Sequence, residues 1–200
     1  MNLVQRAINI NTQPKSEWAQ IAAEPTDTGK LLLGYALPLA LLPFVGTLLG
    51  GLLFAGVLGF TFVLVTAILG LLISLGVLFL MGIIAGALAP SFDGRNTNND
   101  ALKLLVYSST PVWIAGFIGG LIPLVGFLLV LVAYGYAAYL LYLGCQTVLG
   151  VPQQKAIGYT AVVVIVWFLL GAVIGGLIIG AVTLAIVGGA VATGGGMMLR

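Results

Sequence analysis

The carboxyl groups, which could act as catalytic acids or bases, all lie outside the long apolar stretches of the chain. There is no His, and the acidic residues are Glu17, Glu24, Asp27, Asp93 and Asp100. Proton-coupled transporters usually carry an ionisable side chain within a span. Nucleophilic catalysis needs a base beside the attacking hydroxyl, and zinc sites need His or Cys ligands. The sequence therefore predicts a protein that is not an enzyme and has no metal or other cofactor.

Hydroxyl groups are the polar side chains that do fall within the apolar stretches. Ser108, Ser109 and Thr110 follow one another, and Tyr134 and Tyr139 lie in a later stretch. A hydroxyl that leaves water needs a hydrogen-bond partner, because burial without one costs free energy. The pattern fits hydrogen bonds between helices, and it also fits a weakly polar cavity near these residues.

The elements that carry these residues are membrane-spanning helices. Leu31–Pro90 contains no Lys, Arg, Asp, Glu or His, and as one helix it would reach ~90 Å, whereas a hydrocarbon core is ~30 Å thick. The whole chain is 61% hydrophobic and 6% charged, against roughly 25% charged residues in a soluble domain. We therefore predict an all-α, polytopic transmembrane helical bundle.

We predict five spans in a domain over residues 30–190, at about 30–53, 57–89, 101–121, 124–149 and 156–187. Pro38 and Pro43 should kink the first of them. An alternative with six spans arises because Gly175-Gly176 could divide the last stretch into two passes. Residues 191–200 form a glycine-rich C-terminal tail in either case.

Residues 1–29 precede the first span and form an amphipathic arm. Met1–Ile10 has one apolar helical face, and a second helix begins after Thr12 and carries Trp18. We interpret the arm as lying on the membrane surface, and a solvated tail is the alternative.

The positive charges predict the orientation of the chain. Most Lys and Arg residues fall in the arm and in the segments around residues 95–103 and 155, whereas Arg200 is the sole charge at the opposite side. The positive-inside rule then places the N-terminus in the cytoplasm and the C-terminus on the other side. The net charge of +2 gives no reason to expect binding to nucleic acid.

Glycine is abundant, with 29 residues, and many are spaced four apart. Such pairs let helix backbones approach closely in lipid. The candidate helix-packing residues are Gly46, Gly50, Gly82, Gly86, Gly116, Gly120, Gly171 and Gly175. Packing within the bundle and packing against another chain both remain open.

Three segments carry a resemblance to a known family. They are Gln13-Pro14-Lys15-Ser16-Glu17-Trp18 with Ile21 and Glu24-Pro25, Ala101-Leu102-Lys103 with Tyr107–Pro111, and Tyr139–Gly144 with Pro152–Thr160. In this ordered set the chain resembles bacterial inner-membrane members of the Yip family (Ypt/Rab-interacting proteins). The resemblance implies five spans with a cytoplasmic N-terminus.

Eukaryotic members of that family bind prenylated Rab-type GTPases and associate with one another. The arm of this chain, at about thirty residues, offers little surface for a GTPase, so this partner does not carry over. Candidate residues for an interface or a cavity are Trp18, Glu24, Tyr107, Ser108, Thr110, Pro111, Tyr139, Lys155 and Tyr159.

Two functions follow as hypotheses. The first is a non-enzymatic scaffold or membrane organiser that acts through helix packing and self- or partner association. The second is a small transporter, channel or lipid-handling protein with a weakly polar intramembrane cavity. The expected partners are the lipid bilayer and a second copy or other membrane proteins, and the sequence identifies no small-molecule ligand. The expected location is a bacterial inner membrane.

Overall fold

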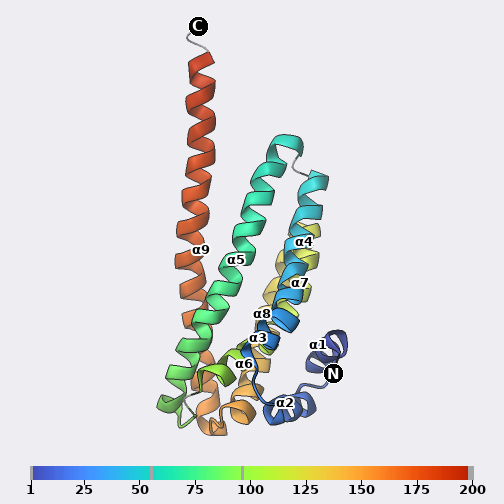
Figure 1. Cartoon of the computed structure of the whole chain (residues 1–200), viewed down its shortest axis with the longest axis vertical. Coiled ribbons are helices and arrows are strands. Elements are labelled where there is room, and N and C mark those ends of the chain that lie inside the picture. The colour runs from blue at the N-terminus through green and yellow to red at the C-terminus, as the bar shows by residue number, and fades with distance from the viewer. Residues whose placement is uncertain (1, 55, 96, 198–200) are drawn as a thin grey trace.

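The computed structural model describes residues 2–54, 56–95 and 97–197, and every regular element of these residues is a helix (Figure 1). Four helices are long and apolar enough to cross a membrane: Thr28–Phe54, Gly59–Phe92, Leu124–Val148 and Gln153–Ala185. The bent pair Asn98–Ser108 and Thr110–Leu121 gives a fifth if it counts as one span. The predicted all-α, polytopic helical bundle is confirmed.

The first spanning helix changes its winding just before a proline. It consists of α3 (Thr28–Leu31), the π-helical turn η1 (Leu32–Ala36) and α4 (Leu37–Phe54). Pro38 has no N–H and its ring would collide with the carbonyl of Gly34, so a wider turn at this point relieves the clash. Asp27 caps the helix, because its Oδ1 accepts from the Lys30 N–H at 3.1 Å.

A second proline bends the helix pair formed by α6 (Asn98–Ser108) and α7 (Thr110–Leu121) by 41°. Pro111 cannot donate to the carbonyl of Tyr107, four residues earlier. The Thr110 hydroxyl donates to that carbonyl instead, at 2.8 Å. The bend therefore leaves Ser108 and Ser109 at a break between two helices, in the interior of the bundle.

Three long helices complete the bundle: α5 (Gly56–Leu88), α8 (Pro123–Val148) and α9 (Gln153–Met197). The turn η2 (Ala89–Phe92) ends α5. α9 passes through Gly175-Gly176 without a break, so the division that the six-span alternative requires is not seen. Residues 191–197 continue this helix, and the last part of the expected tail, 198–200, lies outside the described residues.

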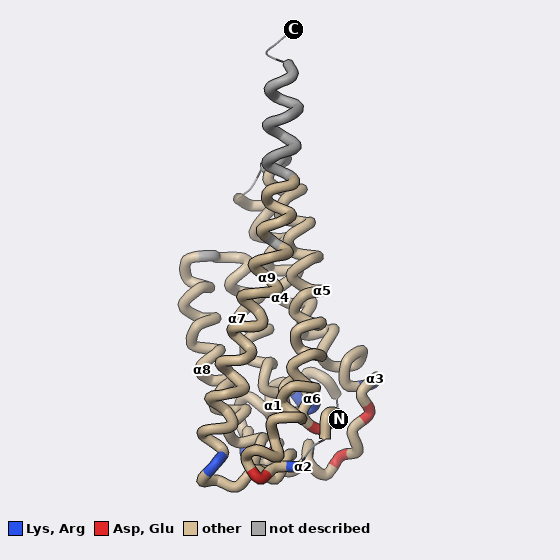
Figure 2. Tube along the Cα trace, turned by 90° about the vertical axis from the view of Figure 1, so that its left-hand side faces the viewer, with Lys and Arg blue, Asp and Glu red and all other residues tan. Residues whose placement is uncertain are grey.

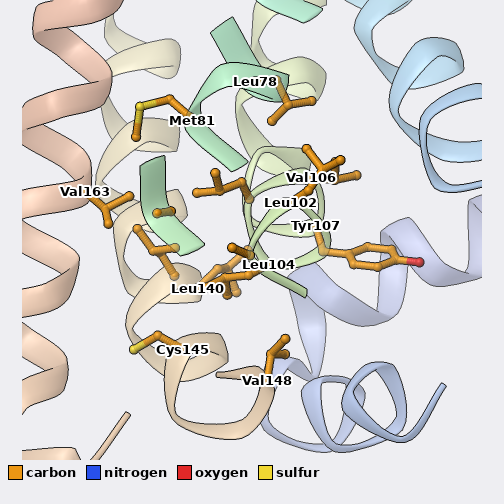
Figure 3. Packing of buried hydrophobic residues seen from close by; sticks show 14 of the residues in the cluster. Leu78, Met81, Leu102, Leu104, Val106, Tyr107, Leu140, Cys145, Val148 and Val163 are labelled. Carbon is orange, nitrogen blue, oxygen red and sulfur yellow. The ribbon is translucent and has the colours of Figure 1, made fainter. Parts of the chain in front are cut away.

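One end of the bundle holds the apolar core and the charged side chains of the described residues. Every Lys, Arg, Asp and Glu of the described residues lies toward this end, which we call the charged end (Figure 2). Here α5, α6, α8 and α9 bury a shared cluster (Figure 3), which includes Leu78, Met81, Leu104, Leu140 and Val163. The charged end is therefore the part of the molecule where the helices are most completely packed.

Candidate functional site

The N-terminal arm is docked on the bundle at the charged end. Its helices are α1 (Leu3–Thr12) and α2 (Pro14–Ala23). Ile10, Trp18 and Ile21 are each at most 1% exposed, so both helices contribute to the core. Val4 and Ile8 face outward with more than half of their surface exposed, which leaves α1 an apolar outer face. The arm is thus an integral part of the folded domain.

A buried arginine ties the two arm helices together. Arg6 Nη1 donates to Glu17 Oε1 at 2.8 Å, and Arg6 Nη2 pairs with Glu24. The guanidinium also lies 5.8 Å from the ring centre of Tyr107. Burial alone lowers the pKa of Arg6, but the carboxylates of Glu24 and Glu17 outweigh it and the pKa is raised. The cation therefore stays charged inside the arm.

Lys103 of α6 fastens the end of α2 to the bundle. Its Nζ donates to the carbonyls of Ile21 at 3.0 Å and Glu24 at 2.9 Å. These carbonyls belong to the C-terminus of a helix, where a cation is stabilised by the helix dipole. Asp100 lies 3.5 Å from the same Nζ and accepts from the Thr26 hydroxyl at 2.6 Å. The connection between arm and first span is held by the same group of residues.

Aromatic rings fill the space between the arm and the spans. Trp18 meets Tyr107 edge to face at 6.3 Å, and Tyr35 lies 4.6 Å from Tyr107. The Tyr35 hydroxyl donates to Thr110 Oγ1 at 2.9 Å, because the Thr110 hydrogen is already used on a backbone carbonyl. Trp18 also covers Gly144 of α8, where a Cβ would come within 2.7 Å of the indole.

Four of the predicted residues therefore come together in one arm-docking cluster. Its members are Arg6, Glu17, Trp18, Glu24, Tyr35, Lys103, Tyr107 and Thr110. Trp18, Glu24, Tyr107 and Thr110 were candidate residues from the sequence, whereas the other four members were not. No spacing rule connects them, since Lys103 lies 82 residues from the carbonyl that it binds.

Lys155 and Tyr159 lie in a second cluster, where the start of α9 meets the end of α5. Lys155 Nζ pairs with Asp93 Oδ2 at 2.7 Å, and the Tyr159 hydroxyl donates to the Ala85 carbonyl at 3.0 Å. Phe92 stacks edge to face on Tyr159 at 5.7 Å. These contacts fix the ends of two spanning helices to each other.

A cavity of about 500 Å³ lies among α4, α5, α6, α7, α8 and α9. Most of its lining is apolar, and none of the described residues that line it is charged. The hydroxyl groups in the lining belong to Thr47, Thr66, Ser74, Ser108, Ser109 and Tyr134. The structure thus places Ser108 and Tyr134 together at one cavity.

The remaining cavity candidates lie elsewhere. Tyr139 does not line the cavity. The residue is 42% exposed, and the centre of its ring lies 5.8 Å from that of Tyr136. Pro111 lines a separate, more open hollow between α1 and α7. Trp113 and Trp167 line the cavity but were not among the candidates. Composition offers no signal for them, because a tryptophan in a span is usually part of the packing or of the interface.

The glycine pairs divide into packed and open positions. A Cβ at Gly46 would overlap the Phe117 carbonyl oxygen, and one at Gly50 would overlap that of Gly120. A Cβ would also come close to a neighbour at three further glycines. The nearest atom would belong to Leu102 for Gly82, at 2.9 Å, to Asn98 for Gly86, at 2.6 Å, and to Pro43 for Gly116, at 2.9 Å. Around Gly171 and Gly175 a Cβ meets nothing within 4 Å, so these two lie outside any close contact in the described chain.

Replacing Tyr136 with phenylalanine tests how firmly α1 is held. The Tyr136 hydroxyl donates to the Asn11 carbonyl of α1 at 2.8 Å. We expect the free energy that holds the arm on the bundle to fall by ~0.5–1.5 kcal/mol in this variant. The change should be seen as faster amide exchange in α1. Tyr139→Phe is the matched control, because that hydroxyl has no comparable bond to the arm. Equal exchange in the two variants would contradict the prediction.

The sequence of the chain matches the model of a known family. The model described as "Yip1 domain" matches residues 8–175, from within α1 to within α9. No curated protein and no solved structure matches the chain. The matched region contains every member of the arm-docking cluster except Arg6, and it reaches from the first spanning helix into the fourth, Gln153–Ala185. The chain therefore belongs to the Yip1 domain family and is an integral membrane protein of that family.

Proposed function

We propose that this protein is a non-enzymatic membrane organiser that holds the chain of a lipid in its intramembrane cavity. The cavity of about 500 Å³ is the observation that carries the proposal, since ligand sites commonly enclose ~300–1,000 Å³ and are mostly apolar. Several ionised side chains at the charged end form structural ion pairs, as Arg6 does with Glu17 and Lys155 with Asp93.

The lining favours an apolar occupant over an ion or a charged solute. Ion pathways are lined by rings of carbonyls or charged side chains, and none of the described lining residues is charged. Water finds few hydrogen-bond partners over most of the lining, because most of it is apolar. A lipid chain meets the same apolar surroundings there as in the bilayer.

The cavity reaches the surface that faces the bilayer. Tyr134 and Phe168 line it and are 36% and 51% exposed, with their rings 5.0 Å apart. At its inner end the lining residues Val77, Leu105 and Val163 are buried. A lipid chain that reaches the cavity from the exposed side at Tyr134 and Phe168 ends against this packed core.

Photocrosslinking in native membranes tests this proposal directly. A benzophenone amino acid at Tyr134 should capture a restricted set of lipids, which mass spectrometry of the adducts identifies. The benzophenone amino acid in place of Tyr139, on the same helix but outside the cavity, should capture lipids in the proportions of the bulk membrane. Identical adduct compositions at the two positions would contradict the proposal.

Filling the cavity should abolish that selective capture. Gly70 lines the cavity and has no atom within 4 Å of its Cβ position, so Gly70→Leu places a side chain in open space. We expect the Tyr134 adduct to fall at least ~10-fold while the protein stays folded. Gly76→Leu, also on α5 with an open Cβ position but outside the lining, is the matched control and should leave the adduct unchanged.

A scaffold that self-associates is the second candidate, and the open glycines of α9 favour it. Gly175 and Gly180 leave room for a Cβ and lie on a helix whose apolar side chains, such as Leu177, are largely exposed. Small residues of this kind mediate contacts between helices in lipid. Gly175→Leu should weaken energy transfer between labelled copies in nanodiscs, whereas Gly135→Leu on α8 should not. An unchanged signal, or one absent from the parent protein, would remove this candidate.

The orientation that we propose puts the charged end in the cytoplasm. Support comes from the Lys and Arg residues gathered there, and the proposed location in a bacterial inner membrane rests on the resemblance to bacterial members. A membrane-impermeant thiol reagent, applied to intact cells with a cysteine at exposed Lys30, should leave that cysteine unlabelled. Labelling in intact cells would reverse the orientation.

A further inference from the structure

At the inner end of the cavity lies a hydroxyl group that donates no hydrogen bond. Ser108 is 5% exposed and lines the cavity, and its hydroxyl has no hydrogen-bond partner among the described residues. Next to it, the Ser109 hydroxyl donates to the Leu105 carbonyl at 2.8 Å. Ser109 Oγ has thus used its hydrogen and keeps lone pairs that can accept. Both residues line the cavity at the bend before Pro111.

We propose that the cavity takes a single-chain, uncharged lipid alcohol whose hydroxyl accepts from Ser108 and donates to Ser109. This inference rests on the proposed function and specifies its ligand. A buried hydroxyl without a partner costs free energy, and the polar end of such a lipid supplies the missing acceptor. The chain then extends past Tyr134 and Phe168 toward the bilayer.

The charge and the size of the cavity narrow the ligand class. A carboxylate or a phosphate would be buried without a cation, because none of the described lining residues is charged. A ketone or an ester can accept from Ser108 but has no hydrogen to donate to Ser109. At ~30 Å³ for each water-sized group, about 500 Å³ holds roughly seventeen groups, which suits one long chain better than two.

The test uses the full-length protein in phosphatidylcholine nanodiscs with photoreactive probes of one chain length. The probes are a diazirine-bearing hexadecanol, its methyl ether, the matching carboxylic acid kept ionised at alkaline pH, and a diacylglycerol with the same chains. Labelling is counted by mass spectrometry in the parent protein and in three variants. Ser108→Ala removes the donor, Gly70→Leu fills the cavity, and Ser74→Ala is a lining control whose hydroxyl already donates to the Leu71 carbonyl.

We expect the alcohol to label most strongly and Ser108→Ala to reduce its labelling ~3- to 10-fold, with Ser74→Ala unchanged. Bound hexadecanol should also raise the unfolding temperature of the parent protein more than that of Ser108→Ala. This variant is expected to fold, because it removes a buried hydroxyl that lacks a partner.

Two outcomes separate this inference from the proposed function. In the first outcome, the four probes label equally, Ser108→Ala has no effect and Gly70→Leu still blocks labelling. A lipid chain then occupies the cavity, but the proposed specificity for an alcohol is refuted. If Gly70→Leu leaves the labelling by every probe unchanged, the lipid-binding function fails together with the inference.

Discussion

Gly120→Leu is expected to separate α4 from α7 and to destabilise the protein by ~3 kcal/mol, the upper end of the usual cost of overpacking. A Cβ at Gly120 would overlap the backbone of Gly46 and Thr47, which a side-chain rotation cannot relieve. The backbones touch because Gly46, Gly50 and Gly120 all lack side chains, so a larger residue forces the two helices apart along their whole contact. The unfolding temperature in detergent should drop sharply, and the exchange of α4 and α7 amides should rise.

Gly135→Leu on α8 is the matched control for this prediction. Its Cβ position has no atom within 4 Å, so leucine there removes the conformational freedom of a helical glycine without any clash. We expect its unfolding temperature to stay at or above that of the parent protein. If Gly120→Leu and Gly135→Leu unfold at the same temperature, the close contact of α4 and α7 is refuted.

The class of fold could be predicted because it depends on composition alone. Sixty residues without a charged side chain have no stable arrangement in water, and a helix is the element that satisfies its own backbone in lipid. The close contact of α4 and α7 could not be predicted from the sequence in the same way. The four-residue spacing is the same for Gly46/Gly50 as for Gly171/Gly175, but only the first pair has a neighbour, and spacing does not say which helix faces it.

The cavity and the docked arm depend on which helices are neighbours, and a single sequence does not contain that information. Tyr134 and Tyr139 are five residues apart, so they point about 140° from each other around α8, and only Tyr134 lines the cavity. Arg6 and Glu17 meet because two separate helices of the arm fold onto each other. Their identity as a buried ion pair follows from tertiary packing and from no local pattern.

Arg6→Leu is expected to release the arm from the bundle. Glu17 is 1% exposed, and without the guanidinium its carboxylate would be buried unpaired. Breaking a buried pair in this way costs ~3–5 kcal/mol, whereas Glu24 is half exposed and loses little. Hydrogen exchange should report rapid opening of α1 and α2, together with new exposure of Trp18, while the spanning helices keep their protection.

The double variant Arg6→Leu with Glu17→Leu identifies the cause, because it removes both charges at once. Replacing a buried pair by apolar side chains is often neutral, so the arm should regain most of its protection. Lys30→Ala provides the surface control, since Lys30 is 88% exposed in its pair with Asp27 and such pairs contribute ~1 kcal/mol or less. If Arg6→Leu exchanges no faster than Lys30→Ala, the arm is held by its apolar contacts alone. If the double variant is as open as the single one, the loss comes from the packing of Arg6 and not from an unpaired carboxylate.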